Sequence, residues 1–247
     1  MRIQLCGATI VEYRGERVEN QLPGRQGRLL FAFLVLNRHR PSSRAELEEV
    51  VWPGQPAAQS GAGLNPLVSK LRRLFGSDII EGRSTLRIRL GVDTRIDVED
   101  AIQSVHRAES QIALGEWKRA WAPSLIALFV SEREFLAGDD GSWVEDQRNA
   151  MSELQLRALE AYTAAAEGMG GTELPAAVRS ARRLIRMAPL RESGYQLLMR
   201  ALSAQGNAAE ALGVYADLRA VLRDELGAEP SAASQAVFDR LIRRGMV

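Results

Sequence analysis

The sequence predicts a mainly α-helical protein with a small β component, in which a winged helix-turn-helix domain precedes an all-α, tetratricopeptide-like domain. Three observations support this fold class. Residues 1–95 combine short β-type segments with three amphipathic helical segments and end in a hairpin pattern. Residues 96–247 are rich in alanine and leucine and are helical in pattern almost throughout. The charge divides at the same point: residues 1–95 hold 15 Lys and Arg against 9 Asp and Glu, and residues 96–247 hold 17 against 22.

The composition is that of an ordinary globular protein with room for two domains. Of the 247 residues, 46% are hydrophobic and 26% are charged, which argues against disorder. The apolar run at residues 29–36 is too short to cross a bilayer, and the N-terminus lacks a signal-peptide pattern. Cys6 is the single cysteine, so an internal disulfide is excluded. We therefore expect a cytoplasmic protein with no membrane partner.

Short strands and one helix are predicted for the first forty residues. The segments RIQLCG and ATIVEY carry alternating or β-branched apolar residues, and Gly15 marks a turn after them. A helix is predicted over residues 25–37, because Leu30, Phe33 and Leu34 recur at helical spacing. Pro41 closes the connection that follows.

A second helix begins after Ser43. Ser43 and Glu46 form a capping-box pattern, in which each side chain satisfies a free backbone N–H at the start of the helix. The predicted buried face consists of Leu47, Val50 and Val51. Pro53 and Gly54 end the helix, and residues 54–63 are a loop by composition.

The third helix, roughly residues 63–75, carries the strongest functional signal. Its predicted buried side consists of Leu64, Leu67, Val68, Leu71 and Phe75. The opposite side presents Asn65, Ser69, Arg72 and Arg73, with Lys70 at its margin. Pro66 disrupts a helix interior but is tolerated in a first turn, so we expect the helix to begin only a few residues before it.

A β-hairpin, the wing, is predicted over residues 79–90. Leucine and isoleucine alternate there with Arg87 and Arg89, and Gly82 supplies the turn next to Arg83. A wing with such residues commonly meets the phosphate backbone or the minor groove of DNA. The alternative is that Arg87 and Arg89 pair with carboxylates of the second domain.

These features together predict a DNA-binding surface. Arginine can bind guanine through two hydrogen bonds, asparagine can bind adenine, and serine or lysine can reach bases or phosphates. A basic first domain joined to an acidic second one fits a protein of which one part meets a polyanion. The predicted DNA-binding residues are Asn65, Ser69, Lys70, Arg72, Arg73, Arg83 and Arg87. The alternative for the third helix is a solvated amphipathic surface.

Helices separated by clear breaks are predicted for residues 96–247. The breaks fall at Gly115, residues 137–141, residues 168–171, Pro189, Gly206 and residues 227–230. The segments TELPAAVRSARRLIRMAP and NAAEALGVYADLRAVLRDELGAEP are similar to each other, each following a glycine and ending near a proline. They indicate tetratricopeptide-like helix pairing with a spacing looser than a strict 34-residue repeat.

The sequence gives no support for an enzyme. His39 and His106 lie in different predicted domains, and the glycines at 168–171 lack the Lys and Ser/Thr of a phosphate-binding loop. Residues 139–140 are acidic but have no calcium-loop spacing, and we interpret them as a loop. We therefore expect no catalytic residue, cofactor or metal. The tryptophans at 117, 121 and 143 are interpreted as packing residues, with an effector pocket as the alternative.

Several motifs resemble the actinobacterial antibiotic-regulatory (SARP) family. MRIQLCG, GRQGRLLFAFLVLNRHRP, SRAELEEVVWP, LVSKLRRLFG and EGRSTLRIRL are similar to its OmpR-type winged helix. Downstream, WVEDQR, RESGYQLLMRAL, GNAAEAL and ELGAEPS resemble the bacterial transcriptional activator domain. The resemblance implies a transcriptional activator that binds direct repeats near promoters and helps recruit RNA polymerase. It also implies that Asn65, Ser69, Lys70, Arg72 and Arg73 enter the major groove.

The expected organisation is a winged helix over residues 1–95 and a helical activator domain over residues 96–247. The expected partners are double-stranded DNA, RNA polymerase and a second copy of the chain. The competing hypothesis is a protein-interaction or ligand-sensing module whose winged helix docks protein rather than DNA. A short regulator and a piece of a longer one are both compatible with the sequence.

Overall fold

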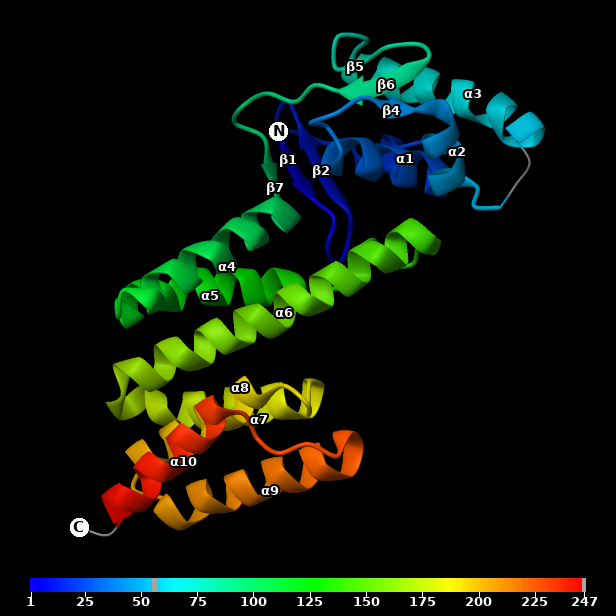
Figure 1. Ribbon diagram of the computed structural model, residues 1–247. Helices are drawn as coiled ribbons and strands as arrows, with labels where there is room; N and C mark the ends of the chain where they lie inside the picture. The colour runs from blue at the N-terminus through cyan, green and yellow to red at the C-terminus, as the bar shows by residue number, and fades with distance from the viewer. Residues whose placement is uncertain (55–56, 246–247) are drawn as a thin grey trace. The chain divides into compact units, whose positions relative to one another are not determined.

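The computed structural model describes residues 1–54 and 57–245 and is mainly helical with short strands (Figure 1), which confirms the predicted fold class. Two compact units are present. Unit 1 comprises Met1–Asp100 and Arg133–Met151, and unit 2 comprises Ala101–Glu132 and Ser152–Val247. The predicted division placed one boundary between residues 95 and 96. In the structure, a later segment of the chain also belongs to the first compact unit.

The three N-terminal strands and one later strand of unit 1 form a four-stranded sheet. Its strands are β1 (Arg2–Gln4), β2 (Ile10–Tyr13), β3 (Glu16–Arg17) and β7 (Arg95–Ile96), in the order β3-β2-β1-β7. β1 is antiparallel to β2 and parallel to β7, with Ile3 opposite Val11 and Ile96. These three side chains are buried, as the alternating pattern requires for one face of a sheet. The three N-terminal strands confirm the prediction, whereas β7 was not predicted.

Three helices form the core of the winged helix: α1 (Gly24–Leu36), α2 (Arg44–Val51) and α3 (Ala57–Phe75). They pack against one another pairwise. The ring of Phe75 on α3 stacks on Phe31 of α1 at 5.0 Å between centroids, and the Tyr13 hydroxyl donates to the Phe75 carbonyl at 2.9 Å. Aromatic pairs of this kind add stability beyond the burial of their area.

The start of α3 differs from the prediction. The helix begins at Ala57, nine residues before Pro66, so the expected start just before the proline is wrong. The predicted loop at residues 54–63 is wrong for the same reason from Ala57 onwards, and its residues 55–56 lie outside the described part of the chain. The helix accommodates Pro66 on an exposed side, where the missing backbone N–H costs less than it would in the core.

A second sheet contains the predicted wing hairpin and one earlier strand that was not predicted. It consists of β4 (Ser42–Ser43), β5 (Ile80–Glu81) and β6 (Thr85–Ile88), in the order β4-β6-β5. Gly82 makes the turn with a φ of +96°, and a Cβ atom there would lie 2.0 Å from the Thr85 carbonyl oxygen. Only glycine therefore fits this turn without displacing the backbone.

The segment Arg133–Met151 completes unit 1. Gly7 N donates to the Glu134 carbonyl at 2.7 Å, and Leu136 N donates to the Leu5 carbonyl at 2.8 Å, so the segment joins the N-terminal strand region. The first turns of α6 (Ser142–Met169) follow. The ring centroids of Trp143 and Phe33 lie 5.2 Å apart in an edge-to-face contact, which confirms the interpretation of Trp143 as a packing residue.

Asp139 lies in a loop, as predicted, and its side chain forms a buried ion pair. Its side chain is fully buried and accepts two hydrogen bonds from Arg28 of α1, at 2.6 and 2.8 Å. Arg25 lies 3.5 Å from the same carboxylate. These hydrogen bonds raise the pKa of Arg28. Asp140, the next residue, is 83% exposed.

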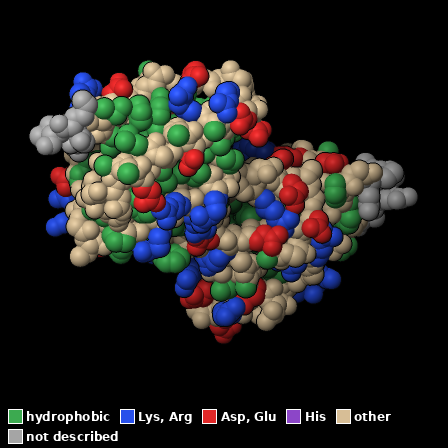
Figure 2. Space-filling view, turned by 90° about the horizontal axis from the view of Figure 1, so that it is seen from below, with side chains coloured by type: hydrophobic (Ala, Val, Ile, Leu, Met, Phe, Trp, Pro, Cys, Tyr) green, Lys and Arg blue, Asp and Glu red, His purple; other side chains and the backbone are tan. Residues whose placement is uncertain are grey.

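Unit 2 consists of helices, and the predicted breaks separate them. The helices are the main part of α4 (Asp97–Ala113), α5 (Trp117–Ser131), the second part of α6, α7 (Leu174–Met187), α8 (Glu192–Ala204), α9 (Ala208–Leu226) and α10 (Ala232–Gly245). α8 packs against α7, α9 and α10. The first residues of α7 and α9 lie 34 positions apart, which is the tetratricopeptide period. Basic and acidic side chains are intermixed over the face shown in Figure 2.

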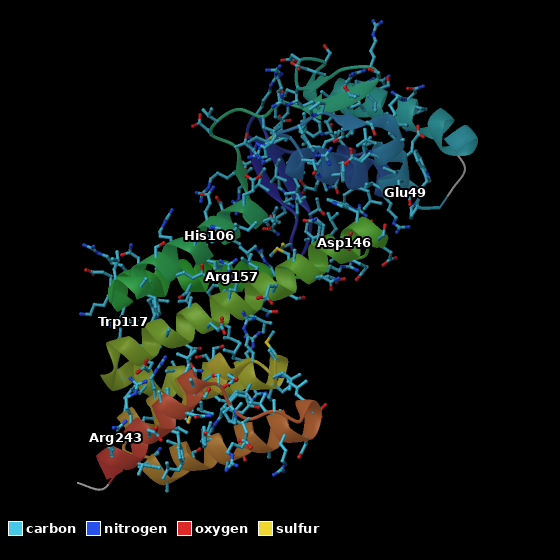
Figure 3. All side chains as sticks on the ribbon, in the orientation of Figure 1. Glu49, His106, Trp117, Asp146, Arg157 and Arg243 are labelled. Carbon is cyan, nitrogen blue, oxygen red and sulfur yellow. The ribbon has the colours of Figure 1, made fainter. Side chains whose placement is uncertain are left out.

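Trp117, labelled in Figure 3, explains a glycine inside α6. A Cβ atom at Gly168 would lie 2.2 Å from the indole ring, so the ring packs directly on the helix backbone. The break itself follows at Gly170 and Gly171, which both have positive φ. Within the part of the chain that the structure describes, no helix has the length and apolar character needed to cross a bilayer.

We expect Asp139→Asn to lower the free energy of unfolding by about 2–3 kcal/mol, because Arg28 would lose its charged acceptor in a partly buried position. Urea unfolding followed by circular dichroism measures this. Asp140→Asn is the matched control and should change the free energy by less than about 0.5 kcal/mol. Equal effects of the two substitutions would contradict the structural role of Asp139.

Candidate nucleic-acid interface

Helix α3 presents one buried and one exposed face, as its periodicity predicts. Leu64, Val68, Leu71 and Phe75 are buried, and Leu67 is half-buried. Asn65, Ser69, Lys70 and Arg73 are exposed, and Arg72 is half-buried. The apolar face holds the helix on unit 1, so the polar face is free to meet a partner.

Arg44, the first residue of α2, was missed by the sequence analysis. Its guanidinium donates to the Asn65 Oδ1 atom at 2.5 Å and to the Arg83 carbonyl at 3.1 Å. It therefore links α2, α3 and the wing. The sequence signal that could have found it is its place directly after the N-cap Ser43, whose Oγ accepts from Glu46 N at 3.2 Å. A side chain at this position lies beside the start of the helix, close to an incoming anion.

Arg72 holds the wing against α3. Its Nε donates to the Ile80 carbonyl at 2.9 Å, and its Nη2 donates to the Gly82 carbonyl at 2.5 Å. Carbonyls at a tight turn have few other donors, so one guanidinium satisfies both the first wing strand and the turn that follows it. Arg72 thus fixes the position of the turn that carries Arg83.

Two hollows lie along the exposed part of α3. The first has a volume of about 370 Å³ and is lined by Arg44, Asn65, Val68, Ser69, Arg72, Gly82 and Arg83. The second, of similar volume, is lined by Gln21, Lys70, Arg73 and Leu74. Among these lining residues are four arginines and one lysine but no carboxylate. Such a surface suits the phosphates and base edges of a nucleic acid.

Arg87 of β6 and Arg89, just past the end of that strand, do not line these hollows. Arg87 donates to the Arg38 carbonyl at 2.9 Å, and Arg89 binds Glu81 on the neighbouring strand at 2.6 Å. Both contacts lie within unit 1. The structure therefore brings Asn65, Ser69, Arg72 and Arg83 together around one hollow, places Lys70 and Arg73 at the other, and separates Arg87 from both.

The two units define a winged-helix protein that also carries a tetratricopeptide-like helical domain. Residues 96–242 match the family model described as the bacterial transcriptional activator domain. This chain belongs to the bacterial transcriptional activator domain family, and the resemblance to SARP regulators is confirmed.

Curated relatives are similar over most of this chain. It is 31% identical over 244 residues to the regulatory protein AfsR of Streptomyces coelicolor, covering 98% of this chain and 24% of AfsR. It is 28% identical over 230 residues to the transcriptional regulatory protein EmbR of Mycobacterium tuberculosis, covering 88% of this chain and 57% of EmbR. The chain thus spans about a quarter of AfsR and just over half of EmbR.

A solved structure has the same fold. Mycobacterium tuberculosis EmbR, in complex with a low affinity phosphopeptide, superposes with a TM-score of 0.83 at 23% identity. The match covers 98% of this chain and 65% of that one. It extends over both units and shows that this chain shares the fold of that structure.

We expect Arg72→Met to lower the free energy of unfolding by about 1–2 kcal/mol, because the Ile80 and Gly82 carbonyls would lose their donor. Backbone amides of residues 80–86 should also exchange faster with deuterium, since the wing would be released from α3. Arg73→Met, on the same helix but exposed, is the control for both measurements. Unchanged exchange in Arg72→Met would show that the wing is held by other contacts.

Proposed function

We propose that this chain is a sequence-specific DNA-binding regulator of transcription, with α3 as the helix that enters the major groove. The observation that supports this most is the exposed polar face of α3, flanked by two hollows with basic linings that lack carboxylates. The geometry suits binding rather than catalysis. The printed names of the relatives, which are regulatory proteins, agree with this role.

The residues of the interface divide by role under this proposal. Lys70 and Arg73 are exposed cations, and we assign them to phosphates and base edges. Asn65 and Ser69 face the base edges. Because Asn65 Oδ1 already accepts from Arg44, its amide NH₂ is the group left to donate, which favours an acceptor such as purine N7.

The wing would provide the second contact. Arg83 is exposed beside the turn, where it can reach a phosphate or the minor groove. Arg72 and Arg44 would act by positioning: they fix the wing and Asn65 before DNA arrives, which lowers the entropic cost of binding. Arg87 is assigned a structural role, because it binds backbone in unit 1.

Regulation would involve protein partners as well. We propose that the chain binds direct repeats near promoters, activates transcription, and uses its helical unit to contact RNA polymerase or a second copy of itself. This part of the proposal rests on the family resemblance. The alternative is a module whose winged helix docks protein, and it predicts little duplex binding at any salt concentration.

Selection of duplexes from a genomic DNA pool, followed by titration at several salt concentrations, tests the proposal. We expect enrichment of a repeated motif and a steep loss of affinity with salt. The variant Lys70→Ala with Arg73→Ala should reduce the slope of log K against log salt by about 2, one for each lost phosphate contact.

Arg107→Ala is the matched control, because Arg107 is an exposed arginine of α4 in unit 2. It should leave both affinity and slope unchanged. Enrichment of no sequence, with the same weak binding by the wild type and the double variant, would overturn the proposal in favour of the protein-docking module.

A further inference from the structure

Helix α5 of unit 2 carries an exposed apolar stripe with a charge at each end. The stripe follows every third or fourth residue along one side of the helix. It consists of Lys118, Trp121, Ala122, Leu125, Ile126, Phe129 and, just past the end of the helix, Glu132. Phe129 is 64% exposed, Ile126 is 50% exposed and Trp121 is 36% exposed. We call this set the α5 stripe.

The opposite side of α5 fixes the helix in place. Ala120, Pro123, Ala127 and Leu128 are buried there. A helix that is apolar on both sides is normally covered on both sides. Single exposed apolar residues are common on protein surfaces, but three large ones on one side of one helix mark an interaction surface.

The ends of the stripe indicate what covers it. Lys118 and Glu132 are 14 residues apart, or about 21 Å along a helix. A second α5 stripe running antiparallel would therefore place its Glu132 against Lys118, and its Lys118 against Glu132. A parallel copy would place lysine against lysine. The stripe is thus complementary in charge to itself in one orientation only.

We propose that two copies of this chain associate through antiparallel α5 stripes, with apolar side chains in the centre and a Lys118–Glu132 ion pair at each end. A two-fold axis relates the copies, so the same patch is used on both. The contact between two single helices is small, and we expect weak association at the low end of specific interfaces.

Glu132 can bind Lys118 of a second copy while it keeps its ion pair with Arg183 of its own chain. It forms an ion pair with Arg183 of α7 in the same unit, and its side chain remains 30% exposed. A carboxylate offers about four lone-pair sites, so it can also accept a hydrogen bond from an ammonium group. Arg183 would then orient Glu132 towards the incoming lysine.

This inference specifies the second-copy partner named in the proposed function and can be tested separately from DNA binding. Direct repeats order two bound copies head to tail, whereas the α5 contact relates two copies by a two-fold axis. We therefore assign it to the protein free of DNA.

Sedimentation equilibrium of the full chain over a wide concentration range tests the apolar part. We expect the wild type to associate and Phe129→Glu to raise the dissociation constant at least about tenfold, because it buries a charge against Trp121 of the other copy at two places in the contact. Leu226→Glu, at a position that is 60% exposed at the end of α9, is the matched control and should leave association unchanged. Equal behaviour of the two variants, or a wild type that stays monomeric, would overturn the proposal.

Charge exchange tests the orientation. Lys118→Glu and Glu132→Lys should each weaken self-association by about two- to fivefold, since each creates like charges at both ends of the contact. An equimolar mixture of the two variants should associate more strongly than either alone. Preferential pairing of Lys118→Glu with the wild type instead would indicate the parallel arrangement and overturn ours. Affinity for a single DNA site should stay unchanged throughout, whereas the Lys70 and Arg73 double variant should lose DNA affinity and still associate.

Discussion

The winged helix of this protein depends on one buried ion pair between residues far apart in the chain. Asp139 is fully buried and binds Arg28 of α1 through two hydrogen bonds. A buried carboxylate without a partner would cost several kcal/mol, so the pair can exist only if the segment around Asp139 is placed against α1. Trp143 then packs on Phe33 of the same helix. The N-terminal unit is therefore completed by residues that follow the first two helices of the activator domain.

Arginines organise the candidate DNA interface in the same way, through backbone and amide acceptors. Arg72 joins α3 to the first wing strand and to the wing turn, and Arg44 joins α2 to Asn65 and to the wing. Three guanidinium groups thus surround one hollow with the geometry already set. A preorganised basic surface loses less entropy when it binds a polyanion. The cations best placed to contact DNA directly are those left free, Lys70 and Arg73 on α3 and Arg83 on the wing.

The helical unit offers a different kind of surface. Its ion pairs, such as Arg157–Glu109 and Arg191–Glu153, lie between helices and are partly exposed, so they contribute modestly to stability. Because each pair joins opposite charges, these pairs add little net charge to the surface of the unit. The α5 stripe is the exception, since its apolar centre is exposed and its two ends carry opposite charges. The proposed DNA interface and the proposed α5 contact therefore lie in different units, which lets each be altered without the other.

The sequence by itself determined the fold class, nearly all of the helices and their breaks, and the buried and exposed faces of α3, because these follow from local periodicity, glycine and proline. It did not reveal the start of α3, because the loop-like composition of residues 57–63 conceals helix. Nor did it distinguish arginines that bind backbone, such as Arg72, from those that remain free, such as Arg73. Only the tertiary structure decided this, and only it showed that the loop residue Asp139 is the partner of Arg28. Residues 111 positions apart meet only after the chain has folded, and no local pattern records such a contact.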